Sequence, residues 1–339
     1  MSIKVKKKYI LFVLVFWAEL AMAQDVQHTQ QYANRLYLNP AFAGINTDWS
    51  VAASHRRQWP TLNGSFITNS LSAAYRIADS KSAISLLLQQ DRAGVGGLKK
   101  LQASLGYAYH TNINDTWAFS AGLQAGIASL RIDLDNLVFG DQLSDNGMIA
   151  LNSAEANRFE PTTYADITVG GLFYSDQFWL GLTAAHLNKP AYGMEQQTEL
   201  QPRYIALAGY KFYARSYEEQ GNLYELSFTP TVTYTQQQNT KRLDIGMYTK
   251  YTPVTFALIY KGVPAIGGTN QDQSLSILAG LQLKQFKLGF SHDVGINGLS
   301  QEAGGANEIS LIFESEDINK LFKSRLKHKL NRNIVCPAF

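Results

Sequence analysis

Residues that could carry out nucleophilic chemistry occur side by side once in this chain, at Ser291-His292-Asp293. A serine hydrolase needs a hydrogen bond between its serine and its histidine. The tripeptide lies in an alternating stretch typical of a β-strand, where neighbouring side chains point to opposite faces, so Ser291 and His292 cannot meet. His110 and His186 could also lie on a polar face, but nothing in the sequence places a serine or an aspartate beside them.

Neither a metal site nor a phosphate site is indicated. The histidines, at positions 28, 55, 110, 186, 292 and 328, show no HxxxH spacing, and the single cysteine excludes a CxxC pair and an intrachain disulfide. Asp91-Arg92-Ala93-Gly94 begins a glycine-rich stretch, but no Lys-Ser/Thr follows to complete a phosphate-binding loop. We therefore expect no catalytic residues, no cofactor and no metal, and we do not expect an enzyme.

The N-terminus has the pattern of a signal for export. Four lysines precede an apolar run from Tyr9 to Leu20, and Ala21-Met22-Ala23 supplies the small residues of a cleavage site. The run is shorter than the ~20 residues that a membrane-spanning helix needs, which disfavours the alternative of a retained anchor. We predict that residues 1–23 are removed, which lowers the formal charge from +3 to about zero.

Strand-like alternation of apolar and polar residues repeats about fourteen times after residue 49. In 101–112, for example, Leu101, Leu105 and Tyr109 share one face, and polar or small residues such as Gln102 and Ser104 share the other. The fourteen predicted strands are 50–58, 66–77, 83–90, 101–112, 117–127, 163–174, 177–187, 203–214, 222–235, 241–251, 253–262, 274–284, 286–294 and 306–314. Each approaches the ~9–11 residues of a tilted transmembrane strand.

The connections between these strands alternate between short and long, with the longest at 134–161. Outer-membrane barrels have short periplasmic turns and longer extracellular loops. The sequence therefore predicts an all-β transmembrane outer-membrane β-barrel of about 14 antiparallel strands over 50–314, with both termini in the periplasm. A soluble sandwich or lipocalin-like barrel is the alternative, and the many polar strand faces disfavour it.

The two faces of the predicted barrel can be assigned from the alternation. Charged residues expected in a polar lumen are Arg76, Arg203, Lys211, Glu225, Arg242, Asp244 and Lys250. Aromatic residues expected at the membrane interfaces are Trp49, Tyr75, Trp117 and Trp179, because they fall at predicted strand ends.

Several short motifs resemble the PorP/SprF family of Bacteroidetes outer-membrane proteins, which belong to the type IX secretion and gliding machinery. The residues that carry the resemblance are Gln31-Tyr32, Asn34, Leu38-Asn39-Pro40-Ala41-Phe42-Ala43-Gly44, Arg57-Gln58-Trp59-Pro60, Asp91-Arg92-Ala93-Gly94 and Cys336-Pro337-Ala338-Phe339. The layout of the whole chain is similar to that of the family. The resemblance implies a barrel that does no chemistry.

The resemblance also implies partners. These are a secreted surface adhesin or its C-terminal secretion domain, which the barrel would hold or help to deliver, and periplasmic secretion-ring or peptidoglycan-associated proteins. Outer-membrane lipid surrounds any such barrel. Nucleic acid is not expected, because the basic bias lies in a tail and not on a folded face.

The lead-in, residues 24–49, has three open interpretations. Pro40 pushes Asn39 towards extended geometry, and Gly44 permits a turn before the first strand. The segment could fold into the lumen as a plug, dock a periplasmic partner, or organise closure of the barrel. We predict that Leu38, Asn39, Pro40, Phe42 and Gly44 bind a partner surface.

Further candidate partner contacts lie at the rim and in the tail. At the rim, Arg57 and Trp59 combine a cation with an amphipathic ring, and Asp91, Arg92 and Gly94 lie in an expected outer loop, where Asp91 and Arg92 could pair locally or meet a partner.

The tail, 315–339, is basic, and its apolar residues at 321, 322, 326 and 330 have helical spacing. We expect the tail to be a periplasmic docking arm, with Cys336, Pro337 and Phe339 as its end. Cys336 superficially matches a prenylation box, which export contradicts. The alternative function for the whole chain is a diffusion porin or small-solute transporter with a charged lumen.

Overall fold

The structure is a computed structural model that describes residues 25–45, 47–78, 80–94, 96–132, 138–144, 147–148, 153, 161–192, 198–219, 222–264, 273–297 and 301–315. The predicted signal, the predicted tail after Ser315 and most of the 134–161 connection lie outside these residues, as do Cys336, Pro337 and Phe339. Among the described residues, no helix is long and apolar enough to cross a membrane.

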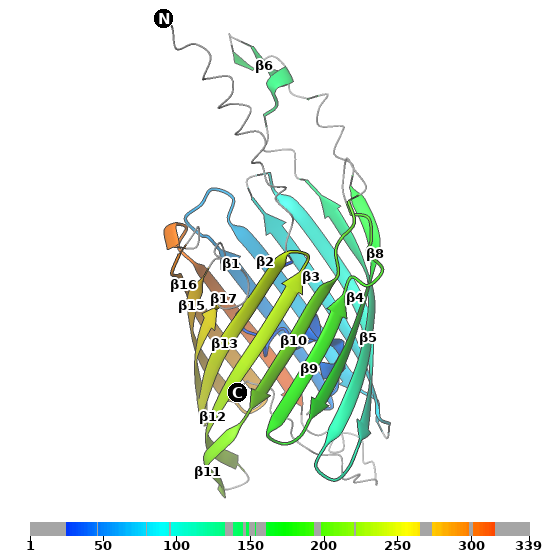
Figure 1. The fold of residues 1–339 in the computed structure, drawn as a ribbon. Coiled ribbons are helices and arrows are strands. Elements are labelled where there is room, and N and C mark those ends of the chain that lie inside the picture. The colour runs from blue at the N-terminus through cyan, green and yellow to red at the C-terminus, as the bar shows by residue number, and fades with distance from the viewer. Residues whose placement is uncertain are drawn as a thin grey trace, which may run out of the picture.

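One large antiparallel sheet makes up the fold (Figure 1). Its strands are β1 (Trp49–Gln58), β2 (Phe66–Arg76), β3 (Ser82–Ala93), β4 (Leu98–Asn112), β5 (Ala118–Arg131), β8 (Thr162–Tyr174), β9 (Phe178–Ala185), β10 (Arg203–Tyr210), β11 (Phe212–Glu219), β12 (Asn222–Gln237), β13 (Thr240–Tyr251), β14 (Val254–Lys261), β15 (Ser274–Leu283), β16 (Phe286–Gly295) and β17 (Ala306–Ser315). Neighbours in sequence pair in order, β1 pairs with β17, and β10 pairs with both β9 and β12, so the sheet closes on itself.

The closed sheet confirms the predicted barrel. The fifteen strand segments of the sheet make a fourteen-stranded barrel, because β10 and β11 run on from each other across Lys211 and pair with successive parts of β12. Closure leaves each strand of the wall paired on both sides, as a membrane interior without water requires. At the short-turn end, the continuation of β10 into β11 pairs with β12 alone among the described strands.

The two faces of the wall are inverted relative to a soluble protein. Outward-facing side chains are large and apolar, such as Leu101, Leu105 and Ile127, which are 58%, 69% and 61% exposed. Inward-facing positions hold buried polar residues, such as Ser104 and Gln124. Apolar residues outside and polar residues inside are the pattern of a barrel that faces lipid.

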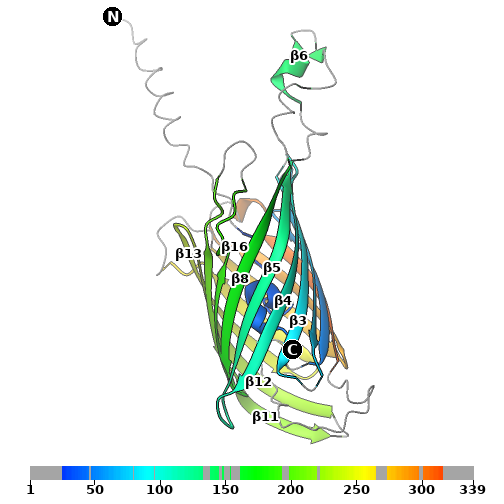
Figure 2. The ribbon, with the colours of Figure 1, turned by 90° about the vertical axis from the view of Figure 1, so that its right-hand side faces the viewer.

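The barrel has two unlike ends. At one end, here the long-loop end, lie the connections that follow β1, β3, β5, β9, β12, β14 and β16; at the other, the short-turn end, lie the turns that follow β2, β4, β8, β11, β13 and β15. The β5–β8 connection at the long-loop end contains η3 (Gly140–Gln142) and a small hairpin of β6 (Leu143–Ser144) and β7 (Gly147–Met148) (Figure 2).

Two details differ from the sequence predictions. The third strand continues to Ala93 through paired residues on β2 and β4, so Asp91 and Arg92 are strand residues and not loop residues. Trp179 points into the lumen and is 1% exposed, so its predicted place in an interfacial girdle is wrong. Its ring fits inward because Gly209, opposite on β10, has no side chain there.

The other predicted aromatic residues face outward at the short-turn end. Trp49 packs on Phe313 with ring centroids 4.7 Å apart, and Trp117 stacks on Phe173, also at 4.7 Å. Tyr75 is 41% exposed on the outer face of β2. These rings form the aromatic girdle that membrane barrels carry at an interface.

Candidate functional site

A single segment, residues 25–45, runs through the inside of the barrel and is called the lumenal segment below (Figures 1 and 2). Asp25 contacts His186 and Gln237 at the long-loop end, whereas Gly44 lies against Ala83 and Arg76 at the short-turn end. The segment therefore passes along the lumen before β1 begins at Trp49. The described chain therefore begins, at Asp25, at the long-loop end and finishes, at Ser315, at the short-turn end. These two positions do not agree with the prediction that both termini lie on the periplasmic side, because the lumenal segment crosses the barrel before β1 begins.

Local sequence explains the shape of the lumenal segment. It is irregular up to Asn34, continues as the short helix α2 (Arg35–Leu38), and then turns into the 3₁₀ helix η1 (Pro40–Phe42). Asn39 is extended, as expected before a proline, and its side chain accepts a hydrogen bond from Ala41 N. Gly44 has a φ of 69°, in the left-handed region that favours glycine, and this turn redirects the chain towards β1.

The start of the segment is held by a buried charged group, here the Asp25 cluster. The Asp25 carboxylate lies 3.1 Å from Lys100 Nζ, 2.6 Å from His186 Nε2 and 3.6 Å from Arg203 NH1. On its other side, His186 Nδ1 is 2.8 Å from Asp166. Lys100 on β4, Arg203 on β10 and Gln237 on β12 thus contact the Asp25 carboxylate directly. Asp166 on β8 acts on it through His186.

Proton binding in the Asp25 cluster is shifted by these neighbours. Burial alone would raise the pKa of Asp25, but Lys100, Arg203 and His186 together hold it well below its usual range. Burial would lower the pKa of His186, but its hydrogen bonds to Asp166 and Asp25 outweigh burial and raise it. The cluster therefore favours a carboxylate and an imidazolium facing each other.

A second charged group surrounds Thr29 and is called the Asp293 cluster, made of Arg56, Lys261, Asp293 and Glu308. Asp293 accepts hydrogen bonds of 2.8 Å from both Arg56 NH2 and Lys261 Nζ. The Thr29 hydroxyl donates to Asp293 at 2.9 Å, and its amide donates to Glu308 at 2.7 Å. Two cations and two carboxylates thus compensate each other's charge around Thr29 of the lumenal segment.

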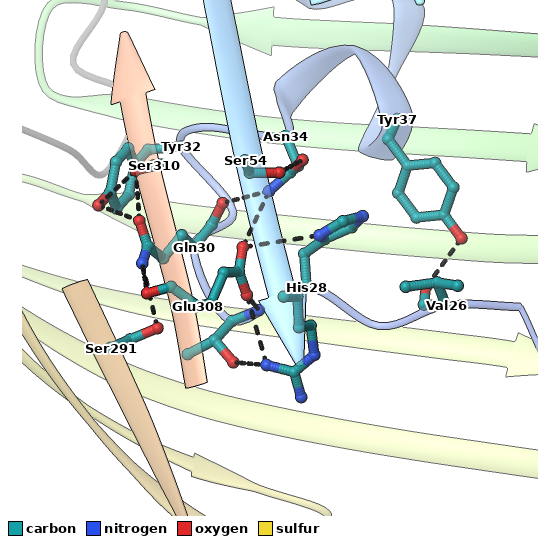
Figure 3. Close-up of polar contacts among 12 residues, drawn as sticks. Val26, His28, Gln30, Tyr32, Asn34, Tyr37, Ser54, Ser291, Glu308 and Ser310 are labelled. Atoms are coloured by element: carbon teal, nitrogen blue, oxygen red, sulfur yellow. Dashed lines mark hydrogen bonds and ion pairs between the residues drawn. The ribbon is translucent and has the colours of Figure 1, made fainter. Parts of the chain in front are cut away.

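Glu308 joins this cluster to the next residues of the segment (Figure 3). Its carboxylate accepts from Asn34 Nδ2 at 3.1 Å and lies 3.6 Å from His28 Nδ1, while its backbone carbonyl accepts from Gln30 Nε2 at 2.6 Å. Glu308 is 0% exposed. A buried carboxylate is tolerated only with such partners, so its position is fixed by the lumenal segment as much as by β17.

The second half of the segment is held by an ion pair between Arg35 and Glu314 at its start and by apolar packing beyond it. Phe42 is 4% exposed and belongs to a buried group with Leu172 and Trp179 on the wall. Backbone groups add to this packing, because Ser120 Oγ donates to Ala41 O and His110 Nε2 to Ala43 O, each at 2.8 Å.

Glycines of the wall let the segment approach closely. A Cβ at Gly122 would lie 2.4 Å from Ala41 N, and one at Gly170 would lie 2.0 Å from Asn39 Oδ1. Real Cβ atoms do not come so near, so these positions match the lumenal segment in shape. A cavity of about 10 Å³ lies between the segment and strands β9, β10 and β12, with room for about one water molecule.

The structure separates the residues that the sequence singled out. Leu38, Asn39, Pro40, Phe42 and Gly44 all lie in the lumen and contact the wall or pack beside it. The wall contacts of Asn39 are hydrogen bonds from Nδ2 to Gly171 O at 3.0 Å and to Leu182 O at 3.2 Å.

The remaining described candidates lie near the long-loop end. Arg57 is exposed on the outer face of β1 and donates to Ser65 Oγ at 3.3 Å, and the Trp59 ring meets Phe66 edge-on. Asp91 faces the lumen and accepts from Gln89, whereas Arg92 points outward. The suggested local pair of Asp91 and Arg92 is therefore wrong, because adjacent strand residues face opposite sides. Gly94 turns the chain with a φ of 71°.

Sequence reasoning missed the acidic side of the site. Arg203, Lys211 and Glu225 lie buried in the lumen as predicted. Of the two carboxylates that bind the lumenal segment, Asp293 was considered only as part of a rejected catalytic tripeptide, and Glu308 was not considered. The alternation within their strands assigns both to the inner face, and that signal could have identified them.

Two of the arrangements considered from the sequence can be located in the described part of the chain. No group of three or more His, Cys, Asp or Glu there could hold a metal ion. Ser291 and Asp293 are buried in the lumen, while His292 faces outward and meets Asn307 Oδ1 at 2.8 Å. Ser291 and His292 therefore point apart, as their spacing predicted.

Comparison with known proteins identifies one family. The sequence profile of the type IX secretion system membrane protein PorP/SprF matches residues 21–313. The search of curated proteins gave no significant match.

Solved barrels resemble the chain at low identity. Omp33 of Acinetobacter baumannii is 6% identical, with 80% of this chain and 99% of that chain covered and a TM-score of 0.44. The toluene transporter TodX of P. putida is 11% identical, with 82% and 93% covered and a TM-score of 0.43. A FadL homologue of Pseudomonas aeruginosa is 11% identical, with 81% and 92% covered and a TM-score of 0.40.

Proposed function

Because this chain belongs to the PorP/SprF family of type IX secretion system membrane proteins, we propose that it is an outer-membrane barrel that binds proteins and does not conduct solutes. Its long-loop end faces outside the cell, since outer-membrane barrels carry their longer loops there. That end holds a secreted surface adhesin, through its C-terminal secretion domain, or helps to deliver it. The opposite end and the tail after Ser315 contact periplasmic components of the machinery.

The occupied lumen is the observation that supports this function most directly. The lumenal segment contacts the wall from the Asp25 cluster at one end to Gly44 at the other, through buried polar and apolar contacts. Each hydrogen bond to a charged group contributes ~1.5–3 kcal/mol. A segment with this many partners is a stable plug, and a plugged barrel suits recognition better than diffusion.

The role of the LNPAFAG motif follows from its position. Its residues face the wall inside the barrel, so they organise closure of the lumen and are not free to dock an external protein. Contact with the secreted partner then belongs to the long connections, with the β5–β8 connection as the first candidate. Trp59 lies in the β1–β2 connection at the same end.

Affinity purification tests the partner role. A tag inserted between Gln238 and Asn239, in the short turn between β12 and β13, leaves the longer connections at that end unaltered. From the native outer membrane in mild detergent, the tagged barrel is expected to retain a secreted adhesin or periplasmic secretion-ring proteins. Deleting residues 138–153 should abolish recovery of the adhesin, whereas a shorter control deletion of 265–271 in the β14–β15 connection should not.

Two outcomes contradict the proposal. One is recovery of the barrel alone under conditions in which a known membrane complex survives the detergent. The other is a solute-selective channel formed by the intact chain in planar bilayers, which would favour the porin. Deletion of residues 28–44 should open a conductance that the intact chain lacks, and heat-modifiable migration on gels verifies that each variant has folded.

A further inference from the structure

Four basic residues form a row across the outer face of the barrel near the long-loop end. The pairing aligns Arg57 on β1 with Ile67 on β2, and Ile67 with Arg92 on β3. It then aligns Arg92 with Lys99 on β4, and Lys99 with Arg131 on β5. Arg57, Arg92, Lys99 and Arg131, here the basic row, are therefore aligned in register across β1–β5, with Ile67 of β2 between the first two. Figure 2 labels β3, β4 and β5 on the viewer's side. Because barrel strands are tilted, the row runs obliquely across the outer face and not at a single depth.

Side chains of the basic row point away from the lumen. Arg57, Arg92 and Arg131 are exposed and Lys99 is half-buried, while the residues between them along the strands, such as Arg56 and Asp91, face inward. The outward position matters because lipid, and not the lumenal segment, covers this face of a membrane barrel. Neither Arg92 nor Arg131 forms an ion pair with any residue that the structure describes.

The level of the row can be judged from the residues beneath it. One step towards the short-turn end, the outer face is polar, with His55, Asn69 and Gln90 on β1–β3. A further step brings the apolar residues Leu71 and Leu88. On β1–β3 the surface thus changes from apolar to polar to cationic over two steps of ~7 Å each along the strand, whereas on β4 the apolar Leu101 follows Lys99 directly.

The distance to the aromatic girdle agrees with this level. Tyr109 lies on β4 ten positions beyond Lys99 and is 46% exposed on the same outer face. Ten residues extend ~33 Å along a strand, which is ~25 Å along the membrane normal at a tilt of ~40°. Since the apolar band of such barrels is ~25 Å tall, Lys99 lies at the depth of the head groups of the opposite leaflet, and its neighbours in the row lie above and below that depth.

The row is confined to one side of the barrel. At the same end, the outer faces of β10, β12 and β14 carry Tyr204, Gln236 and Tyr260. Lys241, aligned with Gln236, is an outward-facing cation on this side of the described barrel near the same end. A general preference for basic residues at the rim would have placed them all round, so the clustering over β1–β5 indicates a bound ligand.

We propose that the basic row binds the phosphate groups of lipid A, the phosphorylated glycolipid of the outer leaflet. Phosphate oxygens are the preferred partners of guanidinium groups, which donate two hydrogen bonds in parallel. Strands ~4.8 Å apart give the row a length of ~19 Å, enough for more than one phosphate. The site fixes the barrel in the membrane by its β1–β5 side and leaves the rest of the rim to protein partners.

The test compares lipid binding by the full-length barrel and three variants in detergent, followed by native mass spectrometry. The probes are bisphosphorylated lipid A, lipid A from which both phosphates have been removed, and phosphatidylglycerol. The variants are R92Q, the triple change R92Q/K99Q/R131Q, and K241Q as the matched control at the same end. Heat-modifiable migration on gels verifies folding, and R92Q alone decides the test if the triple variant does not fold.

The expected result is that bisphosphorylated lipid A binds, and that R92Q weakens binding several-fold and the triple change at least tenfold. K241Q should leave the affinity for bisphosphorylated lipid A unchanged. Lipid A without phosphates should bind the intact barrel and all three variants equally. Equal weakening by K241Q and R92Q would overturn the site. Phosphatidylglycerol binding with the same affinity and the same dependence on Arg92 would overturn lipid A as the ligand.

Discussion

The two halves of the lumenal segment are held by different forces. Residues 25–34 are irregular and bind the wall through two charged clusters, centred on Asp25 and Asp293. Residues 35–45 contain α2 and η1 and bind through apolar packing around Phe42, close contact with wall glycines, and polar contacts at their start, where Arg35 pairs with Glu314 and Tyr37 accepts from Arg203. The first half lies towards the long-loop end and the second towards the short-turn end.

This difference has a physical consequence for how the segment could be displaced. Charged contacts depend on precise partners, and loss of one partner leaves another buried charge unpaired. Apolar packing depends on shape and volume and does not respond to protons. Each half should therefore respond to its own kind of perturbation, and hydrogen–deuterium exchange can follow the two halves separately.

The largest effect is expected from Asp293→Asn. Removing this carboxylate leaves Arg56 and Lys261 buried with less compensation, at a cost of roughly 3–5 kcal/mol. Amide exchange in residues 26–33 should accelerate, while residues 40–45 remain protected. Asp244→Asn is the control, because Asp244 pairs with Arg242 and has no contact with the segment in the described structure. Uniform acceleration along the segment would show that the halves are not independent.

Phe42→Ala should produce the reverse pattern with a similar or slightly smaller effect. The buried phenyl ring packs beside Trp179, and its loss costs about 3–5 kcal/mol through lost burial and the cavity left behind. Exchange should accelerate in residues 40–45 and stay slow in residues 26–33. Phe290→Ala, which removes a ring on the lipid face that is 49% exposed, serves as control. Acceleration near Thr29 would contradict this division.

A smaller effect is expected from Gly170→Val, compared with the adjacent Gly171→Val. At Gly170 the new side chain would collide with Asn39 in the lumen, whereas at Gly171 it would meet only the edge of Phe119 at 3.5 Å. Overpacking of this kind costs ~1–3 kcal/mol. Bilayer recordings of G170V should show openings that G171V lacks, and equal conductance of the two variants would count against the fit described for the second half.

The smallest effect concerns pH and only the first half. His186 has a raised pKa, so its contribution is complete below its ordinary pKa of 6.5 and is lost as the pH rises through the raised value. Asp25 has a lowered pKa, so its contribution is present above 3.8 and is lost as the pH falls through the lowered value.

Protection of the amides near residues 25–28, measured as the exchange rate relative to the intrinsic rate at each pH, should therefore be greatest between about pH 3.8 and 6.5 and weaker at alkaline pH. Titration of exchange against pH measures this, and His186→Asn should remove the alkaline change. His110→Asn is the matched control in the second half, where His110 donates to Ala43 O. A change that persists in H186N would assign the pH dependence to another group.

Strand order and strand faces could be predicted from the sequence because both follow from local alternation. Strand β4, predicted as 101–112, spans Leu98–Asn112, and the alternation gave its outward Leu101 and Leu105 correctly. Trp179 was assigned to the wrong face because an aromatic residue at a strand end fits either an interface or a filled lumen. Only the glycine opposite it, Gly209, decides between the two.

The candidate site was predictable only in part. The sequence singled out LNPAFAG and left three interpretations of it open, since Pro40 and Gly44 specify turns but no neighbours. Asp293 and Glu308 are more than 260 residues from Thr29 in sequence, and their contacts with it exist only after the barrel has closed. The basic row was likewise not predictable, because the register between neighbouring strands aligns its members and their spacing in the sequence does not.

The sequence by itself thus determined a membrane barrel, its number of strands and its two unlike ends, because period-2 alternation and loop length are local properties. Its short motifs, and not this periodicity, indicated the family. The tertiary structure decided what occupies the lumen and which charges meet there. The physical reason is that a buried charge is stable only beside its partners, and closing a sheet of fourteen strands brings together residues from opposite ends of the chain.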